Sequence, residues 1–189
     1  MSVDGLALIQ RSPRWLASVV ALAACLALPA SVDAAAFQSW RSPRLGLVLE
    51  VPTAGITVKV EPAPPDATPR QIQETVLLMR GNVLLVRIDL FSGPQFDVQA
   101  WFDRDGAFAL TPESRVQRTT AGRKGLPALR IANPGSPQAP PQELAFVVLG
   151  TLRVRVTWED AADAAAKPVF ERVLQTLDAP PVGAKEHRR

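Results

Sequence analysis

The sequence has almost none of the side chains that most often carry catalysis. Its 189 residues include one histidine, one cysteine and no tyrosine. His187 lies near the C-terminal end, and Cys25 lies in an apolar run near the N-terminus. Ser-His-Asp and Cys-His catalytic sites need these side chains, as do zinc sites built from histidine and cysteine. Such sites are therefore excluded from the body of the chain, which leaves carboxylate pairs or a Ser–Lys pair for acid–base chemistry.

The sequence also lacks a large excess of positive or negative charge. The chain has 21 lysines and arginines against 18 acidic residues, a formal net charge of +3, and the two signs are interspersed. Proteins that bind nucleic acid usually carry a dense basic stripe. We therefore expect no nucleic-acid partner, and no motif in the sequence predicts a cofactor or a metal ion.

The first 36 residues have the anatomy of a bacterial export signal. Arg11 and Arg14 form a basic segment, an apolar run follows, and Ala34-Ala35-Ala36 matches the small-residue cleavage pattern. The apolar run holds 15 residues between Leu16 and Ala30, whereas a membrane-spanning helix needs about 20. We therefore expect an exported protein, periplasmic or extracellular, that is cut after Ala36.

A second way of processing is open. Leu22-Ala23-Ala24-Cys25 resembles a lipobox, in which the signal is cut before the cysteine and that cysteine is diacylated. The apolar run continues to Leu28 after Cys25, whereas lipoproteins usually pass there to a Ser/Gly-rich tether. Membrane contact is expected only if Cys25 is lipidated.

The rest of the chain predicts one domain, residues 37–178, followed by a disordered tail at 179–189. Residues 62–69 and 133–141 are rich in proline and fit neither a helix nor a strand. Neither segment is long enough to separate two hydrophobic cores. Both are expected to be loops of a single domain.

Strands dominate between these loops. The pattern predicts strands at 45–49 and 56–60, and hairpins that pair 75–79 with 83–91, 115–120 with 126–132 and 143–149 with 153–159. Gly81-Asn82 is a two-residue turn signal of type II′, although a capping box at Thr68 and Gln71 offers a competing helix over 69–79. Residues 144–149 are apolar on both faces and predict a strand covered from both sides. Residues 153–159 alternate and predict one face in water.

Two helices are expected. Asp97 is a candidate cap for a short helix that ends at Gly106, with Gly106 in the left-handed conformation. This explains Asp103-Arg104-Asp105-Gly106 better than a calcium loop, which would need carboxylate ligands at Trp101 and Pro112. The C-terminal helix has an apolar stripe from Ala166 to Leu177, with Pro168 in its first turn. Its expected N-cap is Asp160 or Asp163, so Glu159, Asp160 and Asp163 are interpreted as acidic residues at a helix start.

This order of elements resembles the Mog1/PsbP-like family. Members open with a strand of the form Gly-aromatic-x-aromatic-x-x-Pro and close with an amphipathic helix; here Gly46 to Pro52 and the stripe around Phe170 stand in those places. The resemblance covers most of the mature chain. It implies an α+β fold, in which a mainly antiparallel β-sheet of about six to eight strands is flanked by a short helix and the C-terminal helix in an α/β/α sandwich. It also implies an accessory or binding module, with no family catalytic residues to carry over.

Basic residues gather on one predicted hairpin and its turn: Arg115, Arg118, Arg123, Lys124 and Arg130. They are candidates for a surface that faces anions or lipid headgroups, and a solvated hairpin is the alternative. Arg115 and Arg118 are three residues apart and should point to opposite faces of a regular strand. Trp40, Trp101 and Trp158 are expected in the core, with a ligand cleft as the alternative.

The sequence therefore favours an exported, non-enzymatic binding or accessory module of the cell envelope, whose partner is an unidentified protein or envelope component. One alternative is a structural component of an envelope complex that is tethered through Cys25. The other is a carboxylate-based hydrolase, which requires two buried acids that face each other in a cleft. Its candidate acids are Asp89, Asp103, Asp105, Glu113 and Glu159.

Overall fold

A computed structural model describes residues 36–68, 70–93, 97–159 and 163–179. All of them belong to the second of the two units into which the chain divides, Ala34–Arg189. The predicted export signal up to residue 35, Cys25, His187 and the residues after 179 lie outside the described residues.

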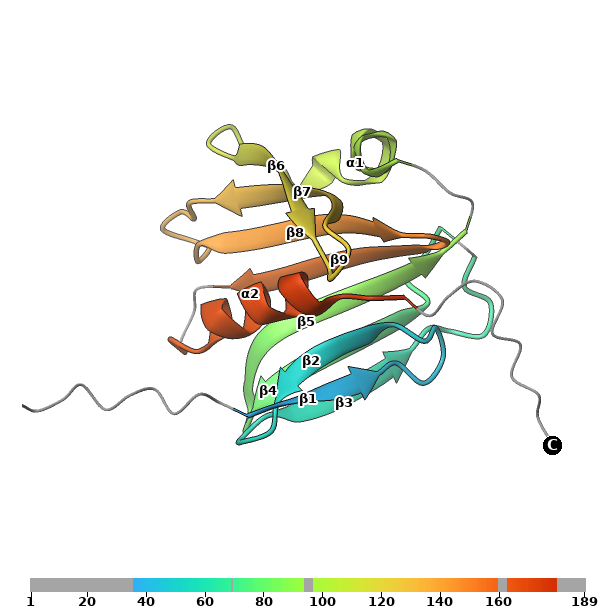
Figure 1. Ribbon diagram of the computed structural model, residues 1–189. Coiled ribbons are helices and arrows are strands. Elements are labelled where there is room, and N and C mark those ends of the chain that lie inside the picture. The colour runs from blue at the N-terminus through green and yellow to red at the C-terminus, as the bar shows by residue number, and fades with distance from the viewer. Residues whose placement is uncertain (1–35, 69, 94–96, 160–162, 180–189) are drawn as a thin grey trace, which may run out of the picture. The chain divides into compact units, whose positions relative to one another are not determined.

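The centre of this unit is an antiparallel sheet of seven strands in the order β3-β4-β5-β9-β8-β7-β6 (Figure 1). The strands are β3 (Thr57–Pro62), β4 (Glu74–Arg80), β5 (Val83–Ser92), β6 (Arg115–Ala121), β7 (Leu126–Asn133), β8 (Gln142–Leu149) and β9 (Leu152–Glu159). The three predicted hairpins are confirmed as β4–β5, β6–β7 and β8–β9. Gly81 turns the first of them with φ +57°, which glycine adopts without strain.

The competing helix over 69–79 does not form, although its capping interaction does. The Gln71 side chain accepts a hydrogen bond from the backbone N–H of Thr68 at 2.7 Å, as in a capping box. β4 begins only three residues later, at Glu74, and pairs with β3 and β5. Sheet pairing therefore overrides the local helix signal, and the described residues 63–68 and 70–73 form a loop, called the loop 63–73 below.

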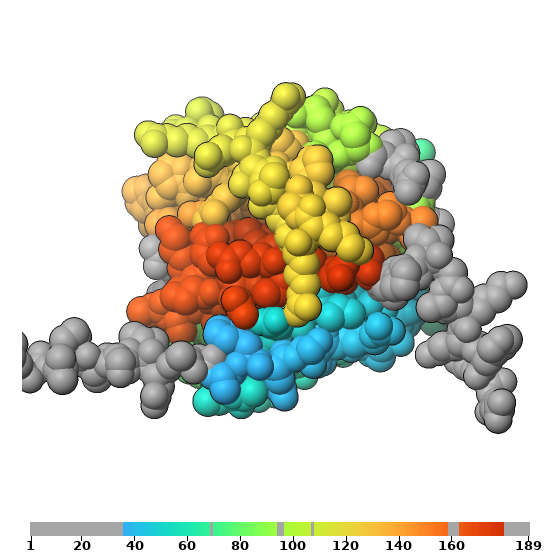
Figure 2. All heavy atoms as spheres, viewed as in Figure 1, coloured from blue at the N-terminus to red at the C-terminus, as the bar shows by residue number. Residues whose placement is uncertain are grey.

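One face of the sheet is covered by β1 (Phe37–Arg41), β2 (Val48–Pro52) and α2 (Ala166–Thr176). Figures 1 and 2 show α2 side by side with β2. The backbone N–H of Glu50 in β2 donates to the Thr176 hydroxyl of α2 at 3.0 Å. The apolar stripe of α2, Ala166, Val169, Phe170, Val173 and Leu174, is buried as predicted and joins the larger hydrophobic core.

The first strand pair differs from the prediction. The expected strand at 45–49 is β2 at 48–52, because the chain turns at Gly46 with φ +70° and its N–H donates to the Ser42 carbonyl at 3.2 Å. β1, which was not predicted, pairs with β2 from Phe37 opposite Pro52 to Arg41 opposite Val48. Pro52 is tolerated because it occupies the end of the strand.

The opposite face carries α1 (Val98–Asp105) and a short 3-10 turn, η1 (Ala107–Ala109). Asp97 caps α1 as predicted, since its side chain accepts the Ala100 N–H at 2.9 Å. The prediction for Gly106 is wrong in its conformation: φ is −110°, because the chain continues directly into η1. Glycine is still required there, since a Cβ atom would lie 2.5 Å from Cδ2 of Phe102.

The start of α2 also corrects the prediction. Its N-cap is Ala165, which makes no side-chain capping hydrogen bond, and Asp160 lies outside the described residues. Asp163 instead accepts the Ala165 N–H at 2.8 Å and two hydrogen bonds from Arg80 at 3.0 Å. Pro168 lies in the first turn, as expected, where its missing N–H costs nothing.

These layers form the α+β fold that was expected, an antiparallel sheet with a helix on each face. The β1–β2 pair is an addition to the layer that contains α2. Within the described part of the chain, no helix combines the length and the apolar character that a membrane crossing requires.

Candidate ligand cleft

Because side chains alternate along the strands, the sheet face that carries α1 presents both aromatic and arginine side chains. Phe146 of β8 points toward α1, whereas its neighbours Ala145 and Val147 join the core beneath α2. β8 is therefore covered on both sides, as predicted. On the same face as Phe146, β5 and β9 present Phe91, Arg153 and Arg155.

A cleft of about 900 Å³ opens on this face, between α1 with η1 on one side and the loop 63–73 on the other. Strands β5, β8 and β9 contribute Phe91, Phe146 and Arg155, α1 and η1 contribute Trp101, Asp105 and Phe108, and the loop contributes Pro64, Asp66, Ala67, Thr68, Arg70, Gln71 and Ile72. We call it the arginine–aromatic cleft. The loop is braced from within, since the Gln73 amide donates to the Thr68 carbonyl at 2.6 Å.

The aromatic side chains of the cleft form a connected cluster. Trp101 packs edge-on against Phe91 with ring centroids 5.6 Å apart, and against Phe146 at 5.0 Å. Phe102 adds an edge contact with Phe146 at 5.4 Å. Edge-to-face geometry at such distances is favourable for aromatic pairs. The cluster fixes Trp101, which is 1 % exposed, and provides an apolar floor.

Arg155 extends this floor with a charged, flat group. Its guanidinium carbon lies 5.7 Å from the ring centroid of Phe91 and 5.6 Å from that of Phe108. It also donates to Oδ2 of Asp89 at 2.6 Å. Asp89 is 1 % exposed, and its other oxygen accepts from the Thr75 hydroxyl and from Arg87 Nε, each at 2.9 Å. This carboxylate is therefore fully engaged and holds Arg155 in position.

Arg153 is the second arginine of β9 on this face, and it contradicts the prediction of a wet face. Its side chain is only 2 % exposed, because α1 and the end of β5 cover it. It donates to the Ser92 carbonyl at 2.8 Å and lies 3.5 Å from Asp105. Burial, together with the charges of Arg104 and Arg70, holds the pKa of Arg153 below its ordinary value, and Asp105 opposes this effect.

Asp105, at the end of α1, is the carboxylate that pairs with Arg104 and Arg153. Arg104 Nε donates to it at 2.9 Å, and this bond lowers the pKa of Asp105 against the opposing effect of desolvation. The charges of Arg104, Arg153 and Arg70 lower it further. Asp105 thus pairs with both Arg104 and Arg153, and the lining of the cleft carries Arg70 and Arg155 together with Asp66 and Asp105.

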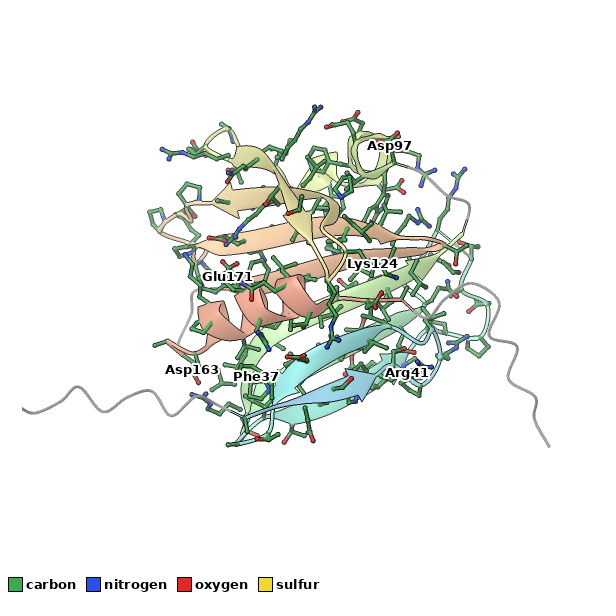
Figure 3. The ribbon with its side chains drawn as sticks, viewed as in Figure 1. Phe37, Arg41, Asp97, Lys124, Asp163 and Glu171 are labelled. Atoms are coloured by element: carbon green, nitrogen blue, oxygen red, sulfur yellow. The ribbon has the colours of Figure 1, made fainter. Side chains whose placement is uncertain are left out.

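The basic residues singled out from the sequence are dispersed. Arg123 pairs with Glu50 at 2.7 Å, Lys124 with Asp178 at 3.2 Å, and Arg130 with Glu143 and Glu171. Figure 3 shows Lys124 near the C-terminal end of α2, with Glu171 farther toward its start. The strand register puts Arg118 opposite Leu129 and Arg115 opposite Ala132, on opposite faces of the sheet as expected. An anion-facing surface on this hairpin stays a prediction.

The candidate acids do not all share one environment. Asp89 is buried, Asp105 lines the cleft, and Asp103 is exposed and accepts from Gln99 at 2.7 Å. Glu113 is exposed, and the side chain of Glu159 lies outside the described residues. Among the residues that are described, no group of three or more Asp, Glu, His or Cys side chains is arranged to hold a metal ion.

The tryptophans divide between the two predicted roles. Trp40 packs against the larger core, and Trp158, 8 % exposed, belongs to it. Trp101 is a core residue that also forms part of the cleft. The sequence therefore offered Trp101 as a possible cleft residue but missed Phe91, Phe108 and Arg155, although Arg153-x-Arg155 on a strand beside one that is apolar on both faces was a signal for them.

No family model and no curated protein sequence matches this chain. Solved structures give fold-level likenesses. A cyanobacterial PsbP (CyanoP) from Synechocystis sp. PCC 6803 has 10 % identity and a TM-score of 0.46, over 79 % of this chain and 96 % of that one. A Bacteroides thetaiotaomicron protein has 13 % identity and a TM-score of 0.42, over 77 % of this chain and 49 % of its own.

A Pseudomonas aeruginosa protein of unknown function, PA94, described as a putative regulator, has 15 % identity and a TM-score of 0.37, over 77 % of this chain and 98 % of its own. The solved structures to which this chain is similar thus include a PsbP protein.

Proposed function

We propose that this protein is an exported, non-enzymatic binding module of the bacterial cell envelope, and that its ligand occupies the arginine–aromatic cleft. The cleft carries the proposal: its volume of about 900 Å³ lies within the range of about 300–1,000 Å³ typical of small-molecule sites. It also has the composition of such sites, an apolar and aromatic floor with a few fixed polar groups.

The carboxylates near the cleft support binding rather than hydrolysis. Asp89 accepts hydrogen bonds from two arginines and Thr75, and Asp105 accepts from Arg104 and Arg153. A general acid must hold a proton, which burial away from cations favours, whereas neighbouring cations favour the ionised form. Both acids therefore serve as counter-ions that position the arginines.

Export is supported by the signal anatomy of residues 1–36. β1 starts at Phe37, the residue after the expected cut. The Ala36 carbonyl accepts from both the N–H and the hydroxyl of Thr53 at 2.8 Å. A cut after Ala36 removes these two hydrogen bonds and leaves β1 at the new N-terminus. A cut before Cys25 leaves residues 26–36 as a tether between a lipid and β1.

Mass spectrometry of the protein from fractionated cells of its native host tests export and decides between the two cuts. We expect a free N-terminus at Phe37 in the soluble envelope fraction. A diacylated Cys25 would instead establish the tethered alternative, and a Cys25→Ser variant should then lose its membrane association. Recovery of the uncut chain from the cytoplasm would contradict export.

Binding and catalysis are separated by incubating the mature protein with a mixture of small envelope metabolites. We expect hydrogen exchange to slow in α1, η1 and the loop 63–73, and the bound compound to be recovered chemically unchanged. Conversion of that compound by the protein, lost in an Asp105→Asn variant, would support the hydrolase instead. Protection confined to another surface would contradict the assignment of the cleft.

A further inference from the structure

We infer that the ligand of the arginine–aromatic cleft is a small organic anion, with a flat apolar body and one oxyanion group such as a carboxylate or a phosphate. This inference rests on the proposed function, because it takes the cleft as the binding site. It adds the chemical class of the ligand, which follows from the exposed ring of Phe108 and the exposed guanidinium of Arg70 in the cleft.

The flat apolar body is indicated by Phe108. Its side chain is 73 % exposed, the most exposed of the large apolar side chains among the described residues. η1 holds this ring over Arg155, whose guanidinium therefore lies between Phe108 and Phe91. Aromatic rings and guanidinium groups both present flat faces on which a planar ligand stacks. A planar body placed here would cover Phe108 and complete the apolar floor that Trp101 begins.

The anionic group is indicated by Arg70. This residue is exposed on the loop side of the cleft, and no ion pair joins it to another residue that the structure describes. Its charge acts on both Arg153 and Asp105, which places it within electrostatic range of the far wall. Arg70 therefore carries an exposed positive charge on the loop wall of the cleft, whereas Arg153 is buried beneath α1. An oxyanion bound in the cleft would pair with the guanidinium of Arg70.

The other charged residues near the cleft limit how many negative groups its ligand can carry. Arg155 already donates to Asp89 at 2.6 Å and lies against two aromatic rings, so its main contribution to a ligand is a stacking face. Asp66 also lines the cleft and disfavours ligands with several negative groups. The arrangement therefore fits one oxyanion on an apolar body better than a polyanion. Carboxylate and phosphate share this chemistry, and the experiment distinguishes them.

The test titrates isotope-labelled mature protein with four probes and follows the indole N–H of Trp101 by NMR. The probes are 2-naphthoate, 2-naphthyl phosphate, the neutral 2-naphthamide and inorganic phosphate. We expect each naphthyl oxyanion to bind about fivefold more tightly than the amide, as one partly exposed charge interaction provides. Inorganic phosphate should bind at least tenfold more weakly than naphthyl phosphate, because it gains no stacking.

Two substitutions assign the two halves of the ligand to their residues. Arg70→Gln should abolish the preference for naphthoate over naphthamide, whereas Arg41→Gln, at an exposed arginine of β1, should preserve it. Phe108→Ala should weaken all three naphthyl probes by about fivefold. Phe37→Ala, at another exposed phenylalanine, is its matched control and should leave their affinities unchanged.

Several outcomes would overturn the inference. Equal affinity for naphthoate and naphthamide would show that the cleft does not select an oxyanion. A preference for naphthoate that survives Arg70→Gln would show that Arg70 does not recognise it. In both cases the cleft would remain a binding site. If no naphthyl probe shifts the indole N–H signal of Trp101, the assignment of the ligand as an aromatic anion is wrong. The metabolite-mixture experiment then decides separately whether the cleft binds another class of ligand, so failure of this inference is distinguishable from failure of the proposed function.

Discussion

At the scale of single residues, the sheet buries carboxylates in two different ways. Asp89 faces the cleft side and is surrounded by donors from Thr75, Arg87 and Arg155. Glu74 faces the larger core and is fully buried, and neither of its carboxyl oxygens has a hydrogen-bond partner. A buried polar group without a partner costs stability, whereas a satisfied one is close to neutral. The two acids should therefore respond in opposite ways to substitution.

Glu74→Leu is expected to stabilise the protein. The leucine side chain has a similar volume and would pack beside Leu90 of β5 without an unsatisfied oxygen. The gain in the free energy of unfolding should be about 1–3 kcal/mol, the cost of an unsatisfied buried group. Urea unfolding followed by circular dichroism measures it. Glu74→Gln keeps an unpartnered polar group and serves as the control, with little or no gain. A Leu variant less stable than the wild type would show that the carboxyl group is satisfied in solution.

At the scale of elements, the strands that were predicted correctly are those whose local signals agree with their tertiary partners. β4 and β5 flank Gly81-Asn82, a turn that specifies its own hairpin, and the alternation of β9 follows its position beside β8. β2 was misplaced by three residues because the turn at Gly46 and the pairing with β1 are set by contacts distant in sequence. β1 has neither alternation nor a turn signal of its own, so nothing local identifies it.

The cleft depends even more than β1 and β2 on contacts between residues that are distant in sequence. Its walls come from the loop 63–73, from α1 with η1, and from three strands, β5, β8 and β9. Sequence patterns predicted each of these strands, but not that Arg155 and Phe91 would become neighbours. The exposure of Phe108 depends on η1, a single 3-10 turn after α1 that no pattern in the sequence predicted. A functional surface of this kind is defined by tertiary register, which one sequence does not specify.

At the scale of the whole unit, the two faces of the sheet are stabilised unequally. α2 buries six of its residues, contacts β2, β5 and β9, and accepts a hydrogen bond at the Leu174 carbonyl from Gly122 at 2.6 Å. α1 buries only Trp101 and Phe102 and packs on β7 and β8. Local opening follows local packing, so the walls of the cleft should open before the core beneath α2 does.

Native-state hydrogen exchange at increasing urea tests this difference. We expect the amides of α1 to exchange through a local opening that depends little on urea, whereas those of α2, β5 and β9 exchange only with global unfolding. Phe102→Leu should speed hydrogen exchange in α1. The amides of α2 should still exchange only by global unfolding, at the lower free energy of unfolding of the variant. Exchange of α1 and α2 with the same free energy and the same urea dependence would contradict unequal stabilisation.

The same experiment connects the mobility of α1 with binding. A ligand that contacts only the closed cleft stabilises it by mass action, so a concentration about tenfold above Kd should slow local opening of α1 about tenfold. 2-Naphthoate is the probe, and Phe108→Ala, with its weaker binding, should need a higher concentration for the same effect. Because the loop 63–73 forms the other wall, its amides should gain protection together with α1. Protection of α1 alone would mean that the ligand lies against the helix rather than between the two walls.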